Sequence, residues 1–139
     1  MEQKPPIETL LPHRTPFLFA DKICTASKEE ITAVKTFSKD DQLLQGSFAA
    51  SGFVPGTILI ESMAQCGGAG IKLLNLTNGL FGLVSIDNAQ MLKGAEYGKE
   101  ITYHIRNLRV TDNIIKQSGV AYMAGEPVAE ATWMCVRIE

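Results

Sequence analysis

Apolar residues dominate one segment in the middle of the chain, just after Pro55 and Gly56. They cover most of the circumference of a helix there, at Ile58, Leu59, Ile60, Met63 and Ala64. A helix that is apolar nearly all round belongs inside a domain. Pro55 and Gly56 interrupt the preceding structure, and Thr57 can cap the first turn. The pattern therefore predicts a buried central helix that runs to about Leu74 or Leu76.

Elsewhere, apolar and polar positions follow the shorter period of β-strands. Before the helix, the pattern predicts a short helical segment at residues 7–11 and a hairpin of two strands at residues 17–25 and 31–37. After the helix, it predicts four strands, at residues 80–90, 100–110, 114–123 and 128–138. Residues 38–55 form a long irregular connection, and long loops in compact domains are usually functional or mobile.

One apolar helix and about six antiparallel strands bury most apolar surface when the sheet wraps around the helix. The pattern therefore predicts an α+β fold that resembles the hot-dog fold, as a single domain over residues 1–139. The length of 139 residues fits one domain with a real core. Gly67, Gly68 and Gly70 lie inside the predicted helix, where glycine costs stability. We expect a strand or a partner helix to pack directly on the backbone there.

Charge and cysteine content exclude several classes of function. The net charge is −2 and the basic residues are scattered, so no nucleic-acid surface is expected. No apolar run is long enough for a membrane span, and the N-terminal residues lack the apolar core of a signal peptide. The three cysteines are an odd number in apolar segments, which favours reduced thiols in the cytoplasm. Their spacing, with two histidines, matches no metal site, and we expect neither metal nor cofactor.

Glu61 is the residue of the central helix that requires an explanation. A carboxylate on a buried helix is costly unless it is paired or hydrogen-bonded. It is either a structural carboxylate paired with an arginine or a functional group, and the helix pattern leaves both interpretations open.

Several segments resemble, in order, the 3-hydroxyacyl-[acyl-carrier-protein] dehydratases of the FabZ type. The N-terminal motif is LPHRTPFLFADKI, at residues 11–23. The motifs around the central helix are Gln45-Gly46, Val54-Pro55-Gly56 and Glu61-Ser62-Met63-Ala64-Gln65. Looser matches follow at residues 85–89, Gly125 and residues 128–131. The resemblance covers essentially the whole chain.

The resemblance implies removal of water from a 3-hydroxyacyl thioester to give a trans-2-enoyl thioester. It assigns acid–base chemistry to Glu61 and places the backbone N–H of Gly56 at the thioester carbonyl, where the helix dipole favours developing negative charge. It also places Gln65 and Phe48 among the substrate-binding residues. In this family a loop histidine joins the glutamate, typically across a homodimer interface.

The loop histidine of that family is absent from this chain. Its position, fourteen residues before Glu61, is Ser47, and the proline that usually follows Phe48 is Ala49. A serine hydroxyl is no base at neutral pH without its own activator. Ser47 is therefore either a loop serine with a local turn bond or a group that orients a water or the substrate hydroxyl. The family has a histidine at His13 as well, so His13 is expected to be a structural hydrogen-bonding residue near the site.

Three functions follow from this pattern. The first is a dehydratase, a hydro-lyase with an atypical site in which Glu61 and Ser47 are the candidate catalytic residues. The second is a catalytically silent acyl-binding subunit that partners an active hot-dog dehydratase, and the third is a thioesterase in which one carboxylate activates water. All three imply an acyl-carrier-protein or acyl-CoA thioester as the partner. An apolar edge strand at residues 80–90 would favour a homodimer, a higher homo-oligomer or a hetero-oligomer with a related subunit.

Overall fold

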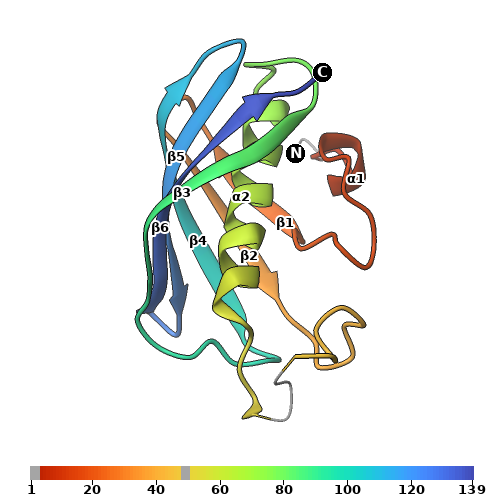
Figure 1. Ribbon diagram of the computed structural model, residues 1–139, viewed down its shortest axis with the longest axis vertical. Coiled ribbons are helices and arrows are strands. Elements are labelled where there is room, and N and C mark those ends of the chain that lie inside the picture. Colours follow the sequence, from red (N-terminus) through yellow and green to blue (C-terminus); the bar gives the residue numbers. More distant parts are fainter. Residues whose placement is uncertain (1–3, 48–50) are drawn as a thin grey trace.

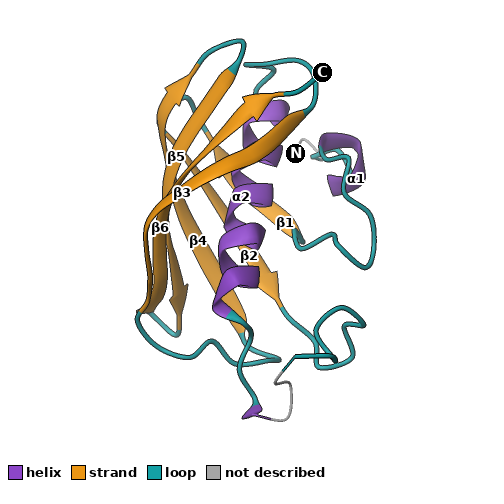
Figure 2. Ribbon diagram, viewed as in Figure 1, coloured by secondary structure: helices purple, strands orange, loops and turns teal. Residues whose placement is uncertain are grey.

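The computed structural model describes residues 4–47 and 51–139, in which a curved antiparallel sheet packs against one long helix (Figures 1 and 2). The elements are α1 (Ile7–Leu10), β1 (Lys22–Ala26), β2 (Glu30–Thr36), α2 (Gly56–Leu73), β3 (Phe81–Met91), β4 (Glu100–Val110), β5 (Ile114–Met123) and β6 (Glu126–Arg137). The predicted hot-dog arrangement of one central helix and six strands is confirmed.

The six strands are arranged in the order β1-β2-β4-β5-β6-β3, so β1 and β3 form the two edges. Burial alternates along the inner strands β2, β4 and β5, as the period of two requires. In β4, Ile101, Tyr103 and Ile105 are buried toward α2, whereas His104 and Arg106 are exposed on the outer face. The core therefore lies between α2 and the inner face of the sheet.

Two predictions at the ends of elements were wrong. The first strand begins at Lys22 rather than at residue 17, because the backbone of Phe17 and Phe19 hydrogen-bonds to the side chain of Gln65 instead of a neighbouring strand. The helix starts at Gly56 with Pro55 as its N-cap residue and no side-chain cap, so Thr57 does not cap the first turn.

The glycines of α2 serve two different purposes. A Cβ at Gly67 would overlap the side chain of Gln117, and one at Gly70 would overlap Ile31. These two glycines let the sheet pack on the helix backbone, as expected. A Cβ at Gly68 would meet only Leu11 Cδ2, at 4.0 Å. Gly68 therefore lies on a more open face of α2, which forms part of the pocket described below.

Hydrogen bonds made by buried side chains hold α2 against the N-terminal segment and the sheet. The Ser62 hydroxyl donates to the carbonyl of Phe19 at 2.7 Å and accepts from the Tyr103 hydroxyl at 2.7 Å. On the other side, the Gln117 amide donates to the carbonyl of Gly67 at 3.2 Å. The helix is thereby fixed to the N-terminal segment and the sheet at once.

Within residues 4–47 and 51–139, no helix has the length and apolar character needed to cross a membrane.

Candidate active site

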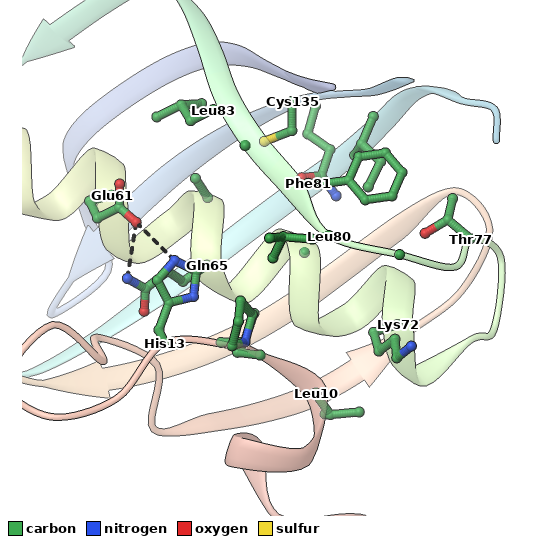
Figure 3. A pocket seen from close by; sticks show the side chains of 18 of the residues that line it. Leu10, His13, Glu61, Gln65, Lys72, Thr77, Leu80, Phe81, Leu83 and Cys135 are labelled. Atoms are coloured by element: carbon green, nitrogen blue, oxygen red, sulfur yellow. Dashed lines mark hydrogen bonds and ion pairs between the residues drawn. The ribbon is translucent and has the colours of Figure 1, made fainter. Parts of the chain in front are cut away.

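A pocket of about 230 Å³ lies along one side of α2, between the N-terminal segment, the start of β3 and strands β5 and β6. Its helix wall includes Glu61, Gln65, Gly68 and Lys72. These positions are spaced by four, three and four residues, which places them on one face of a helix. Figure 3 shows Glu61 at one end of the pocket and Lys72 and Thr77 toward the other.

The carboxylate of Glu61 faces this pocket and is held by neutral neighbours. Its side chain is 22 % exposed. The Gln65 amide donates a hydrogen bond to Oε2 at 2.9 Å, and Nε2 of His13 lies 3.9 Å from the same oxygen. Among the described residues, no arginine or lysine pairs with Glu61, so the structural ion-pair interpretation is not supported. A partly open carboxylate in a largely apolar pocket is a suitable acid–base group.

Gln65 joins the site to the N-terminal segment. Its carbonyl oxygen accepts from the N–H of Phe19 at 2.7 Å, and its amide nitrogen donates to the carbonyl of Phe17 at 2.9 Å as well as to Glu61. Both N–H groups of the amide are therefore engaged by the protein itself. Gln65 lines the pocket, and its hydrogen bonds position Glu61 and the segment that carries His13.

His13 differs from its sequence-based expectation. Its ring makes no hydrogen bond within the described part of the chain, and Nδ1 is buried without a partner. The ring lies beside Phe17, with centroids 6.2 Å apart and planes 25° apart. Burial lowers the pKa of His13 below its ordinary value of 6.5, and the nearby Glu61 charge opposes this shift. His13 is thus a predominantly neutral imidazole that faces a carboxylate.

The other predicted site residues lie elsewhere in the chain. Gly56 lines a separate hollow of about 220 Å³ beside Met91 and Leu92. Five residues separate Gly56 from Glu61, which corresponds to a rotation of about 140° around the helix. Ser47 is exposed in the loop before α2 and donates a local hydrogen bond to the carbonyl of Leu44 at 2.9 Å. Phe48 lies outside the described residues.

Sequence reasoning missed two titratable pocket residues, Lys72 and Cys135. Lys72 could have been found from its spacing, because it lies three turns after Glu61 on the same helix face. Cys135 gave no such signal, since it reaches the pocket from β6, at the far end of the chain. Burial, with a contribution from the Glu61 charge, raises the pKa of its thiol to about 11. The thiol is therefore protonated at neutral pH and is no ready nucleophile.

Comparison with known proteins gives consistent results. The pattern of the ApeP-like family, described as ApeP dehydratase, matches residues 5–79. The 3-hydroxyacyl-[acyl-carrier-protein] dehydratase FabZ of Thermotoga petrophila is 34% identical over 125 residues, which cover 90% of each chain. FabZ of Aeromonas hydrophila is 33% identical over 142 aligned positions, covering 96% of this chain and 92% of the relative.

Solved structures share the fold at low sequence identity. The dehydratase heterocomplex ApeI:P from Xenorhabdus doucetiae contains a chain with a TM-score of 0.86 and 17% identity, covering 99% of this chain and 93% of that one. An HP0420 homologue from Helicobacter felis has a TM-score of 0.70 and 13% identity, and the match covers 100% of this chain and 93% of that one. With the hot-dog fold, the ApeP-like match and the FabZ relatives together, this chain belongs to the ApeP-like, FabZ-related family of dehydratases.

Proposed function

We propose that this chain acts on 3-hydroxyacyl thioesters, carried on acyl carrier protein or coenzyme A, and removes water to give trans-2-enoyl thioesters. The observation that carries the proposal is Glu61, a carboxylate held by Gln65 at one end of a largely apolar pocket. Such a pocket suits an acyl chain, and the carboxylate suits the proton transfer that loss of a hydroxyl requires. The FabZ relatives, which are 3-hydroxyacyl-[acyl-carrier-protein] dehydratases, support the same reaction.

The proposal assigns the thioester carbonyl to the N-terminal end of an α2 helix, at Gly56. Backbone N–H groups and the helix dipole favour the negative charge that develops on this oxygen when the α-proton leaves. Gly56 and Glu61 face different sides of α2, about 140° apart. One substrate can reach both groups only if Gly56 comes from one subunit and Glu61 from another. The complete site therefore needs a second hot-dog subunit.

The surface for this subunit is the free edge of β3. Four of its large apolar side chains are exposed: Leu83, Val84, Ile86 and Met91. An apolar edge strand is a template for pairing with another strand. The second subunit is either a copy of this chain or a related one. The dehydratase heterocomplex ApeI:P, which contains a chain of this fold, supports a related subunit.

We further propose that Ser47 occupies the place of the family's loop histidine. The Ser47 hydroxyl donates its proton to the carbonyl of Leu44 and also interacts with the side chain of Tyr97, so only an acceptor lone pair is left to orient a water or the substrate hydroxyl. The three cysteines are free thiols, which suits a reducing compartment, and we place the reaction in the cytoplasm.

Glu61→Gln tests the proposal, because glutamine keeps the size of the side chain and removes its acid–base function. The purified protein, with any subunit that co-purifies, is assayed for enoyl thioester formation from 3-hydroxyacyl thioesters of several chain lengths. We expect a loss of about 100-fold or more in kcat. Glu100→Gln, on an exposed position of β4, is the matched control and should keep the wild-type rate.

Formation of other products, or of no product, would refute the proposed dehydratase activity. Release of free thiol without enoyl product would point to a thioesterase. Absence of turnover by the wild-type protein, together with co-purification of an active hot-dog subunit, would point to a silent acyl-binding subunit.

A further inference from the structure

We propose that His13 is a catalytic residue, the proton-transfer partner of Glu61 within the same chain, and that it supplies the imidazole that the loop before α2 lacks. This inference rests on the proposed dehydratase function and names a second catalytic group for it. It commits to an imidazole from this chain, whereas the alternative source is a loop histidine of the second subunit.

The first argument is the position of the ring. His13 and Glu61 line the same pocket, and Nε2 of His13 lies 3.9 Å from Oε2 of Glu61 (Figure 3). The His13 side chain is 30 % exposed, so it is open on the pocket side. A substrate lying in this pocket would have both groups within reach of adjacent carbon atoms. The chain's other histidine, His104, is exposed on the outer face of the sheet and edge-on to Tyr122.

The second argument is that hydrogen bonding does not explain this ring. A structural histidine in a folded core normally satisfies its ring nitrogens, yet Nδ1 of His13 is buried without a partner in the described residues. The ring is placed by its backbone instead. Arg14 donates to the carbonyls of His13 and Leu11 at 2.7 and 2.8 Å, and Gln65 holds Phe17. Both sides of His13 are therefore fixed, which preorganises the imidazole at the pocket wall.

The chemistry balances with these two groups alone when the cycle starts from a neutral His13 and from Glu61 in its carboxylic-acid form. The neutral Nε2 of His13 takes a proton from C2 of the substrate, and the electron pair of that C–H bond forms the C2–C3 double bond. The C3–O bond breaks, and the hydroxyl leaves as water with a proton from the Glu61 carboxylic acid. The products are the enoyl thioester, water, an imidazolium and a carboxylate. The imidazolium then returns its proton to Glu61 across the short gap between them, which restores the starting state.

The surroundings keep the imidazole in its accepting form. The charged groups that act on it are Glu61 of α2 and Arg14 of its own segment, and the other titratable groups that line the pocket are Lys72 of α2 and Cys135 of β6. Burial favours the neutral ring, Arg14 adds to this effect, and Glu61 opposes it. A neutral imidazole at neutral pH can accept a proton, and the adjacent carboxylate stabilises the imidazolium that results.

The decisive variant is His13→Gln, with His104→Gln as the matched control. Enoyl thioester formation is measured from pH 5 to 9 for the protein with any subunit that co-purifies. For His13→Gln we expect kcat to fall about 100-fold to 10,000-fold with KM changed little, and the acid limb of the wild-type pH profile to disappear. His104→Gln should keep the wild-type rate and profile. A kcat for folded His13→Gln within about threefold of wild type would overturn the inference and assign the imidazole to the other subunit.

A second measurement covers the case in which His13→Gln fails to fold. The chain has two histidines, so the imidazole resonances in an NMR titration are assigned by His104→Gln alone. Coupling between His13 and Glu61 predicts that Glu61→Gln lowers the pKa of His13, because the opposing carboxylate charge is gone. An unchanged pKa would overturn the inference. If Glu61→Gln lost activity and His13→Gln kept it, the proposed dehydratase function would hold and the catalytic role of His13 would be refuted. An inactive wild-type protein would refute both proposals.

Discussion

The amide nitrogen of Gln65 lies 2.9 Å from Oε2 of Glu61, one helical turn earlier on α2. The same nitrogen donates to the carbonyl of Phe17, and the amide oxygen accepts from the N–H of Phe19. One buried side chain therefore sets the orientation of the candidate acid–base carboxylate and the path of the N-terminal segment beside it. This links the stability of the fold to the geometry of the site.

Replacing Gln65 by leucine should lower the stability of the fold and loosen the geometry of the site. The change leaves the buried N–H of Phe19 and the partly buried carbonyl of Phe17 without their partner, which costs about 3 kcal/mol in the free energy of unfolding. Urea titration of the purified variant measures this loss. Gln42→Leu, at an exposed loop position, is the control and should change the free energy by less than about 0.5 kcal/mol. Equal stability of the two variants would contradict the role given to Gln65.

The two kinds of glycine in α2 should respond oppositely to alanine. Gly70→Ala forces Ile31 to move and should destabilise the fold by about 1–3 kcal/mol. Gly68→Ala meets only Leu11 at van der Waals distance and should stabilise the helix by up to about 1 kcal/mol. The free energies of unfolding of the two variants measure the difference. Because Gly68 lines the pocket, its variant should also bind acyl thioesters more weakly.

Much of this architecture follows from local patterns, but the site does not. The helix and the four strands after it were predictable because apolar residues there follow the period of each element. The first strand was predicted too long, since the partner of Phe17 and Phe19 is a side chain 46 residues or more further along. The approach of His13 to Glu61 depends on the same tertiary contact. A family motif placed His13 near the site, but only the folded chain reveals that its Nδ1 is buried without a partner in the described residues and that its Nε2 faces Glu61.

Stability should depend on pH through His13. Burial lowers the pKa of its imidazole in the folded chain below the ordinary value of 6.5, so the unfolded chain binds the proton more readily. The native state is therefore favoured fully above pH 6.5 and loses this contribution as the pH falls from 6.5 to the folded pKa. Denaturant titrations at pH 8 and pH 5.5 should give a larger decrease for the wild type than for His13→Gln. An identical decrease in both proteins would show that another group is responsible.

A lysine on the edge of β3 should disrupt subunit association. Val84 is 53% exposed on this edge strand, where a second hot-dog subunit is proposed to pair. A charge there must be desolvated when the strands meet, so Val84→Lys should lower the apparent mass in analytical ultracentrifugation and reduce kcat by leaving the site incomplete. Leu108→Lys provides the matched control, since Leu108 is 52% exposed on β4, which lies inside the sheet. If Val84→Lys kept the wild-type mass while Leu108→Lys dissociated, the subunit interface would lie on another surface.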